Sequence, residues 1–449
     1  MTTLLIIAIC IIILIVGKFY VANNEEVFGN ISEMVSIFNF GYSLTGGMRA
    51  TTRDVAYKNA LIVGPSGSGK TSTVLIATLN SIARSNSSMV VLDVSGEIYT
   101  LMSGYLSTKS KIYCIDFSEN SDGFNPLDCK NVSDIQKIAS ILIKNSGTES
   151  KSDPYWSASA EKILCVFIQY LIEYTPQDYH NMATLVRMIE TFAGEPEKID
   201  RCFAKTSGDI LTTYKSIISV GEKTLQSSVS TALVALKLFK NPEVARCSAK
   251  STINFEDFRK EKSILFINTP VTDVNFLAPY SALLFEQLFK VVLSSIPQKN
   301  ECSIFAILDE MVTMRFQNLG LVFSNIRKYK GGCIGIVQDE RMIEMNYSVA
   351  EAHAIRTNSF SKVYLPGQPH ATCKMLEEMI GKDEHNKIAM PASHIRTAEE
   401  AIIICGNKKP FKEKMISFYN HFILNRRTKY PKYELTRKIP FDTPPILEF

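Results

Sequence analysis

The sequence lacks the close pairs of cysteines that build zinc sites and small disulfide-bonded domains. Its ten cysteines are scattered singly, and no CxxC pair or short cluster of cysteine with histidine occurs. These absences argue against both kinds of site, and they fit a reducing, cytosolic environment for most of the chain. The net charge of +4 is also small for 449 residues, so whole-chain charge alone does not indicate a nucleic-acid-binding protein.

A guanine-specificity signature is missing as well. Asp93 begins a DxxG sequence of the kind found in GTPases, but no NKxD signature accompanies it, because Asn407-Lys408-Lys409-Pro410 lacks the aspartate. The sequence therefore favours an adenine nucleotide over a guanine nucleotide.

Charge is absent from residues 3–17, and residues 4–16 are all Leu, Ile, Val, Ala or Cys. Continuing to Ala22 gives the roughly 20 residues that a bilayer-spanning helix needs, with Lys18 as the single charge. A cleaved signal peptide is the alternative, but no cation precedes the apolar run and no clear small-x-small cleavage site follows it. We predict a single-pass anchor in the cytoplasmic (inner) membrane, and Lys18 on its C-terminal side predicts that the bulk of the chain is cytoplasmic.

Residues 60–71 place a short apolar run before a glycine-rich turn and a segment with helical periodicity. The pattern GxxxxGK[ST] is complete in Gly64, Pro65, Ser66, Gly67, Ser68, Gly69, Lys70 and Thr71. In this pattern the glycines let backbone N–H groups point at an anion, the lysine binds the β- and γ-phosphates, and the hydroxyl binds Mg²⁺. The sequence therefore predicts a P-loop that binds ATP and Mg²⁺ through Lys70 and Thr71.

Apolar, β-branched runs alternate with helical patterns on both sides of a long helical stretch. After the P-loop, such runs occur at residues 88–94, 111–117, 263–268, 303–309, 332–337, 361–365 and 401–405. Strands that are apolar throughout and separated by helices predict a parallel sheet covered on both faces, and so an α/β fold. Residues 128–255 have helical periodicity instead, and within them Asp153-Pro154 is a typical helix start.

The expected organisation therefore has four parts. Residues 1–22 form a transmembrane anchor and residues 23–58 a linker with short elements. The α/β P-loop nucleotide-binding domain comprises residues 59–127 and 256–449, and residues 128–255 form an all-α domain inserted into it.

Polar residues that could complete an ATPase site follow two of the predicted strands. Asp309 and Glu310 lie at the end of the predicted strand 303–309, where we expect Asp309 to act on the metal and Glu310 to polarise the attacking water. Gln338 ends the next strand, where it either senses the γ-phosphate or is an ordinary strand-end amide. Arg327 is the candidate for an arginine that acts on a neighbouring subunit's nucleotide, and a helix-surface arginine is the alternative.

Residues 407–438 are locally basic, with ten Lys and Arg residues against two glutamates. A solvated surface explains such a run more often than a nucleic-acid contact does. Aromatic residues in the same stretch, including Tyr419 and Phe422, suit either base stacking or packing.

The ordered set of motifs resembles one family, the type IV secretion coupling proteins, which are conjugative DNA-transfer ATPases. The resemblance covers residues 45–420 and rests on the P-loop, Asp93-Val94-Ser95-Gly96-Glu97, Asp116-Phe117, Asn125-Pro126-Leu127, Asp153-Pro154-Tyr155-Trp156, Lys223-Thr224, Leu308-Asp309-Glu310, Ile326-Arg327-Lys328-Tyr329, Gln338, residues 358–365, Gly367 and Ile380-Gly381. Val94 and Ser95 depart from it, because a Pro-Lys pair is usual there.

This resemblance implies a membrane-tethered, RecA-like motor that assembles as a homo-hexamer. Such proteins pass a relaxase-bound DNA strand or a protein effector to the type IV secretion channel. On this reading Lys70 and Thr71 hold ATP and Mg²⁺, Asp309 and Glu310 carry the hydrolytic chemistry, Gln338 links nucleotide state to movement, and Arg327 acts in trans. Two alternatives stay open: a P-loop kinase of a small molecule, and a nucleotide-dependent receptor for secreted proteins.

Overall fold

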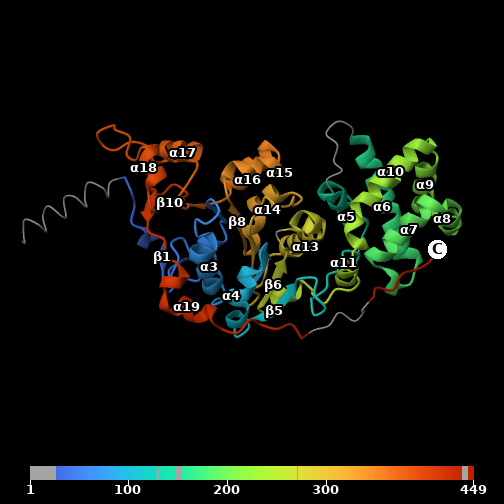
Figure 1. Ribbon diagram of the computed structural model, residues 1–449, viewed down its shortest axis with the longest axis horizontal. Coiled ribbons are helices and arrows are strands. Elements are labelled where there is room, and N and C mark those ends of the chain that lie inside the picture. Colours follow the sequence, from blue (N-terminus) through green and yellow to red (C-terminus); the bar gives the residue numbers. More distant parts are fainter. Residues whose placement is uncertain (1–26, 129–130, 147–153, 271, 437–442) are drawn as a thin grey trace, which may run out of the picture. The chain divides into compact units, whose positions relative to one another are not determined.

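The computed structural model describes residues 27–128, 131–146, 154–270, 272–436 and 443–449. Figure 1 labels their helices and strands. Within these residues the chain divides into two compact units. The first unit takes the described residues of Met1–Ser87, Phe305–Met311 and Phe323–Tyr430, and the second takes those of Ser88–Ile304, Val312–Val322 and Pro431–Phe449. The predicted membrane anchor at residues 1–22 lies outside the described residues.

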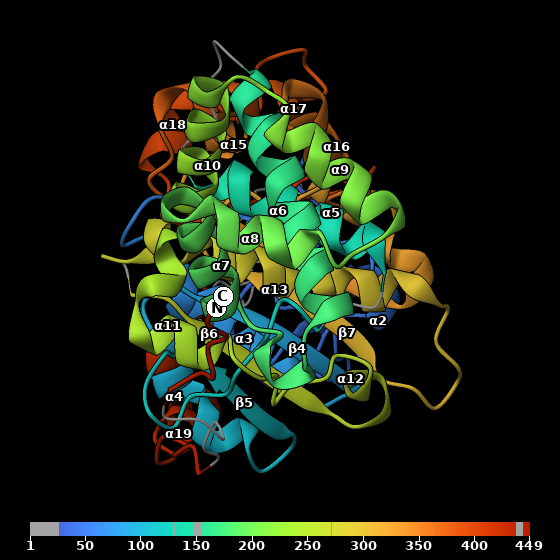
Figure 2. The same cartoon turned by 90° about the vertical axis from the view of Figure 1, so that its right-hand side faces the viewer.

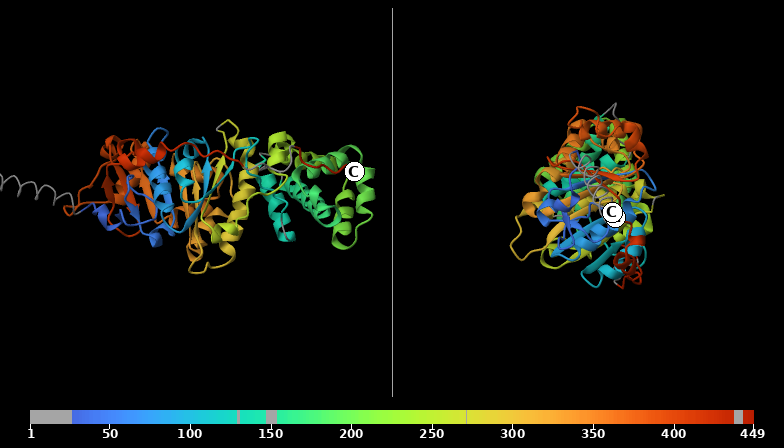
Figure 3. Two further views of the ribbon diagram at one scale, coloured as in Figure 1. Left: turned by 90° about the horizontal axis from the view of Figure 1, so that it is seen from below. Right: turned by 90° about the vertical axis from the view of Figure 1, so that its left-hand side faces the viewer.

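The first unit is built on a mixed sheet. In the order in which they lie side by side, its strands are β11 (Phe411–Glu413), β10 (Ala401–Cys405), β9 (Ser361–Tyr364), β3 (Ala60–Val63), β8 (Gly331–Val337) and β7 (Ser303–Leu308). Of β7, the residues from Phe305 onwards belong to this unit. β3 pairs in parallel with β8 and β9, so that Ala60 lies opposite both Ile334 and Ser361. Figure 3 shows this as a blue strand between orange ones.

The prediction of a parallel sheet is wrong at one edge. All seven strands predicted after the P-loop are present, with ends within two residues of those expected. However, β10 runs antiparallel to both β9 and β11. Residues 406–410 join β10 to β11, and so short a connection can only link antiparallel strands. Burial on both faces makes β10 apolar throughout, and that pattern does not reveal the direction of a strand.

Residues expected to form a linker are folded into the first unit. They include β1 (Val35–Ser36), which pairs antiparallel with β2 (Ala50–Thr51). Tyr42 is buried, and its hydroxyl donates to Ser361 Oγ at 2.8 Å. The helical elements of this unit are η1 (Ile31–Glu33), α2 (Arg53–Ala56), η2 (Lys70–Leu75), α3 (Ile76–Ile82), the end of α14 (Leu319–Asn325), η5 (Ile326–Tyr329), η6 (Glu340–Met342), α15 (Ile343–Asn346), α16 (Val349–Thr357), α17 (His370–Ile380), α18 (Ala392–Thr397), η7 (Phe418–Asn420) and α19 (Phe422–Thr428).

The second unit combines three parallel strands with many helices. β6 (Ser263–Asn268) lies between β4 (Ser87–Asp93) and β5 (Lys111–Ile115). In the described residues of 128–255 the regular elements are all helical, as predicted: α5 (Val132–Asn145), α6 (Pro154–Tyr174), η3 (Gln177–Tyr179), α7 (Met182–Gly194), α8 (Pro196–Phe203), α9 (Gly208–Ile218), α10 (Glu222–Ala235), η4 (Lys237–Lys240) and α11 (Pro242–Cys247). The remaining helices are α4 (Glu97–Leu106), α12 (Asp257–Lys260) and α13 (Val274–Ser294).

Helix α6 organises the helical segment of the second unit. It packs against α5, α7, α9 and α10 (Figure 2). Its apolar stripe includes Phe167, which is fully buried and contacts the rings of Phe203 and Tyr214. Those two rings stack with their centroids 3.9 Å apart. The predicted helix start at Pro154 is confirmed, whereas its predicted cap, Asp153, lies outside the described residues.

Helix α13 is the one helix in the described part of the chain that is long and apolar enough to cross a membrane. Its most apolar stretch has a mean hydropathy of 1.4, and 67% of that stretch is buried inside the protein. Core helices and membrane spans share such a composition, so this helix is explained by burial in the second unit.

Asp93 ends β4 and holds the start of α4. Its Oδ2 accepts a hydrogen bond from the Tyr99 amide at 2.7 Å, and the whole residue is buried. Burial raises the pKa of Asp93 from 3.8 to about 6, and backbone hydrogen bonds only partly oppose that rise. Because the folded state binds this proton more tightly than the unfolded state, Asp93 reduces stability as the pH rises from about 4 to about 6.

We therefore expect an Asp93→Asn variant to gain stability relative to the parent protein over that pH range. The asparagine oxygen still accepts from the Tyr99 amide, while the cost of a buried charge disappears. Two pKa units correspond to at most about 3 kcal/mol. Urea midpoints measured from pH 4 to 7 test this, with Glu119→Gln, in an exposed turn, as the control. If the plots of stability against pH for the parent protein and for Asp93→Asn stayed parallel, the expected effect of the buried charge would be contradicted.

Candidate functional site

The predicted site residues of the first unit, apart from Arg327, gather at one edge of its sheet. The P-loop follows β3, Gln338 follows β8, and residues 365–368 follow β9, so all three lie at the carboxyl ends of parallel strands. The Met311 amide donates to the Ile336 carbonyl at 3.0 Å, which brings the end of β7 to the same edge. This edge is where open α/β sheets bind ligands.

The P-loop backbone requires its three glycines. Gly67 and Gly69 have φ values of 78° and 88°, in the left-handed region that favours glycine. At Gly64 a Cβ atom would lie 2.4 Å from Ser68 Oγ and 3.0 Å from Leu365 Cβ. The Gly64 amide donates to the Val337 carbonyl at 3.1 Å and so ties the loop to β8.

Lys70 turns back into the loop that it follows. Its ammonium donates to the carbonyls of Gly64 and Pro65 at 2.7 and 3.2 Å. Lys70 also begins the π-helical turn η2, which continues into α3. Ser68 Oγ is buried and has no hydrogen-bond partner in the described residues. A cation held inside the loop and an unpaired hydroxyl beside it fit a phosphate group.

Glu310 lies close to Lys70 and Gln338. Its φ of 56° is unusual for a residue other than glycine. Burial raises the pKa of Glu310, while the Lys70 charge and a hydrogen bond from the Gln338 side chain oppose that rise. Three predicted residues therefore meet, and the carboxylate among them has a raised proton affinity suited to a general base.

Thr71 and Asp309 are the residues that fit a magnesium ion. Both are half-buried, and hydroxyl and carboxylate oxygens are ligands that Mg²⁺ accepts. In the described residues no group of three or more His, Cys, Asp and Glu could hold a metal ion by itself. A magnesium ion here would take further ligands from phosphate and water, as it does at other nucleotide sites.

Arg327 is not brought together with the other predicted residues. It lies in η5, which precedes the amino end of β8, and it lines a pocket at the edge of the sheet opposite the P-loop. Arg327 therefore lies at a different place from Lys70 and Glu310.

Gln368 is a residue of this site that the sequence did not indicate. It is 4% exposed, and its side-chain amide donates to the carbonyls of Val63 and Leu365 at 3.0 and 2.8 Å. It fixes the loop after β9 against the strand that leads into the P-loop. The signal in the sequence that could have indicated Gln368 is its position directly after Gly367, just beyond a buried strand.

These features define a P-loop α/β protein. The chain belongs to the family described as "Type IV secretory system Conjugative DNA transfer", whose model matches residues 14–389. It is 24% identical over 435 residues to Protein VirD4 of Rhizobium radiobacter, covering 86% of this chain and 59% of that protein. Protein VirD4 of Agrobacterium fabrum (strain C58 / ATCC 33970) is 24% identical over 366 residues, which are 76% of this chain and 51% of that one. The chain thus spans little more than half the length of these curated relatives.

Solved structures share its fold. The bacterial conjugative coupling protein TrwBdeltaN70 has a TM-score of 0.66 at 17% identity, over 82% of this chain and 87% of that one. The plasmid coupling protein TrwB in complex with ADP and Mg²⁺ has a TM-score of 0.65 at 16% identity, with the same coverage. The predicted RecA-like α/β fold is confirmed by this likeness, whereas the separate all-α domain and the N-terminal transmembrane helix stay predictions.

Proposed function

We propose that this chain is a membrane-anchored ATPase that couples a substrate to a type IV secretion channel. The substrate is relaxase-bound single-stranded DNA, a protein effector, or both, and ATP hydrolysis drives its transfer. The observation that carries this proposal is the meeting of Lys70, Glu310 and Gln338 at the carboxyl edge of the sheet, in a chain of the conjugative DNA-transfer family. TrwB supports it further, because one TrwB structure contains ADP and Mg²⁺.

Each residue at this edge has a distinct role in the proposed hydrolysis. The loop from Gly64 to Gly69 and the ammonium of Lys70 hold the phosphates of ATP, and Thr71 and Asp309 hold Mg²⁺, which neutralises charge on those phosphates. Glu310 accepts a proton from the attacking water. Gln338, which donates to Glu310, orients that carboxylate and transmits the state of the γ-phosphate to β8.

The assembly that we propose is a homo-hexamer held at the cytoplasmic membrane by residues 1–22. Residues 59–127 and 256–449 form the motor domain, and residues 128–255 form an all-α domain that meets the substrate. Arg327 completes the site of a neighbouring subunit. Its distance from Lys70, at the opposite edge of the same sheet, supports action in trans.

The full-length protein, purified in lipid nanodiscs, is expected to release phosphate from ATP, and faster with single-stranded DNA. A Lys70→Ala variant should lose this turnover and abolish transfer of a marker plasmid in cells, while still inserting into the membrane. Lys374→Ala, on the exposed side of α17, is the matched control. Normal transfer by Lys70→Ala would refute the proposal. A phosphorylated metabolite in place of free phosphate would indicate a kinase, and binding without hydrolysis a receptor.

A further inference from the structure

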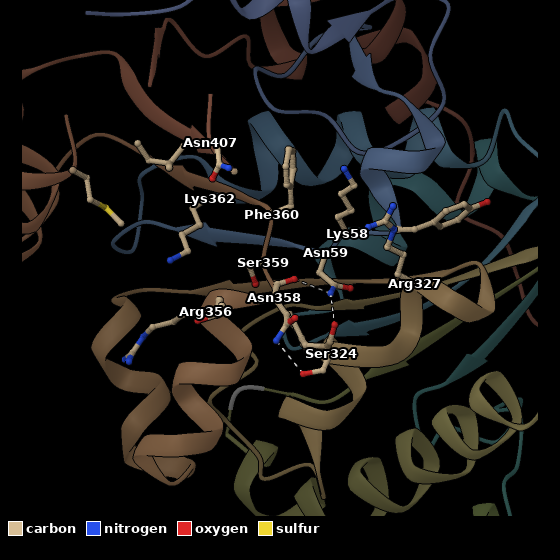
Figure 4. Close-up of a pocket in the computed structure, with 16 residues that line it drawn as sticks. Lys58, Asn59, Ser324, Arg327, Arg356, Asn358, Ser359, Phe360, Lys362 and Asn407 are labelled. Atoms are coloured by element: carbon tan, nitrogen blue, oxygen red, sulfur yellow. Dashed lines mark hydrogen bonds between the residues drawn. The ribbon is translucent and has the colours of Figure 1, made fainter. Parts of the chain in front are cut away.

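A pocket of about 500 Å³ lies at the amino ends of β3, β8 and β9, opposite the P-loop edge (Figure 4). Four cationic side chains line it, and none of the described residues in its wall carries a carboxylate. These cations are Lys58, Arg327, Arg356 and Lys362. The pocket is therefore built for an anion.

The base of this pocket is held rigidly by Asn59. This residue is buried and has a φ of 58°. Its side-chain amide donates to the carbonyls of Phe323 and Asn358 at 2.8 and 3.0 Å, and its Oδ1 accepts from the Cys333 amide at 2.8 Å. The Asn59 side chain thus joins the segments around Phe323, Cys333 and Asn358. The backbone that carries the cations of the pocket is therefore held in one position.

Two of the four cations are already neutralised. Arg356 lies 3.4 Å from Glu340 and 2.6 Å from Glu344, and Lys362 lies 3.4 Å from Glu340. In Figure 4 these two side chains lie on one side of the pocket, away from Lys58 and Arg327. Arg356 and Lys362 therefore serve the structure of the unit.

Lys58 and Arg327 remain for a ligand. The Lys58 ammonium lies 4.6 Å from the centroid of the Phe360 ring, which fixes its position without cancelling its charge. Gly406 packs directly beneath that ring, since a Cβ atom there would lie 2.4 Å from it. Arg327 is exposed, and no hydrogen bond or ion pair engages its side chain in the described part of the chain. An ammonium held by an aromatic ring and an exposed guanidinium in the same pocket suit a phosphate group.

These two cations cannot reach a phosphate in the P-loop of their own chain. The four residues of β3 separate Asn59 from Gly64, and at about 3.3 Å per residue this strand alone spans about 13 Å. One unit thus carries a phosphate cradle at one edge and free cations at the opposite edge. Identical chains that join such unlike surfaces head to tail form a closed ring when the rotation permits.

We propose that this pocket receives the phosphate chain of a nucleotide held by a second copy of the protein, and that Lys58 acts on it together with Arg327. This inference rests on the proposed function and adds Lys58 as a second cation supplied in trans, positioned by Phe360. Lys58→Ala is expected to lower ATP turnover about 100-fold, because a preorganised charge next to the reacting phosphate is lost. Nucleotide affinity of the P-loop stays within about threefold.

Mixing variants separates action in trans from action within one chain. Lys58→Ala chains keep an intact P-loop, and Lys70→Ala chains keep an intact pocket. In rings assembled from equal amounts of the two variants, roughly one site in four pairs an intact P-loop with an intact pocket on the neighbouring chain. We therefore expect about a quarter of parental turnover, although each variant alone is inactive. Lys328→Ala, next to Arg327 but outside the pocket, should retain full turnover alone and about half when mixed with Lys70→Ala.

No recovery in the mixed rings would overturn the proposal. It would equally be wrong if Lys58→Ala left basal turnover unchanged but weakened binding of single-stranded DNA, because the pocket would then hold a nucleic-acid backbone.

A second measurement does not depend on hydrolysis. An ATP analogue with a photoreactive group on its γ-phosphate is bound to Lys58→Ala chains mixed with longer, tagged Lys70→Ala chains. We expect label on the tagged chains, in peptides containing Lys58 or Arg327, since those chains hold no nucleotide themselves. Label confined to the untagged chains would overturn the inference. Label in trans without any turnover by the parent protein would support the pocket while refuting the ATPase function.

Discussion

A Glu310→Gln variant is expected to bind ATP normally and to hydrolyse it about a thousandfold more slowly than the parent protein. Removing a general base costs between a hundredfold and ten thousandfold in rate. Glutamine has nearly the same shape as glutamate, so the turn after β7 and the contact with Gln338 are kept. Burial raises the pKa of Glu310, which means that the negative charge of this side chain destabilises the folded protein. The neutral variant is therefore expected to unfold at an equal or higher temperature.

Phosphate release and titration with a fluorescent ATP analogue measure the two effects separately. Lys70→Ala should lose affinity as well as turnover, because it removes the charge inside the loop. Glu378→Gln, on the exposed side of α17, controls for the loss of a carboxylate elsewhere in the unit. Turnover by Glu310→Gln within threefold of the parent would show that another group serves as the base.

Replacing Glu340 with alanine is expected to lower the free energy of unfolding of the protein by about 3 kcal/mol. Glu340 is 5% exposed, and it faces Arg356 and Lys362 at 3.4 Å and accepts from the Tyr364 hydroxyl at 2.5 Å. Burial and the neighbouring Glu340 charge both raise the pKa of Tyr364. Loss of Glu340 leaves two cations without their buried partner, and breaking such a pair costs about 3 to 5 kcal/mol.

Urea unfolding followed by tryptophan fluorescence and by circular dichroism provides the test. Glu344→Ala is the matched control: it breaks the more exposed Arg356 pair, and pairs at the surface contribute less than about 1 kcal/mol. Adding Lys362→Met to Glu340→Ala should restore part of the stability, because one of the unpaired charges is removed. Equal effects of Glu340→Ala and Glu344→Ala would contradict the importance of burial.

Much of the fold was predictable because its signals are local. The strands of the sheet are continuous apolar runs, and the P-loop is a contiguous motif whose chemistry depends on backbone shape. Asp309, Glu310 and Gln338 could be predicted to lie at one edge because each follows an apolar strand and the carboxyl ends of parallel strands meet there. Each of these signals lies within a few consecutive residues.

The features that the sequence did not reveal depend on partners far away in the chain. Lys58 acquires its position from Phe360, and Gln368 from the carbonyl of Val63. The buried Glu340 is indistinguishable in sequence from an exposed glutamate, since its partners come from α16 and β9. The direction of β10 was missed for a different reason, because burial on both faces makes a strand apolar whichever way it runs.

Helix α13 has a consequence for biosynthesis. It is composed like a membrane span, yet the folded protein buries most of its apolar stretch. Helix α5 packs against it, and the rings of Phe117 and Phe124 contact Tyr280 within it. Until these segments have folded, nothing in its composition separates it from a true span, and apolar surface exposed during synthesis invites aggregation or insertion. All of them precede α13 in the chain, so they leave the ribosome first. The order of synthesis therefore supplies part of the surface that buries this helix before the helix itself emerges.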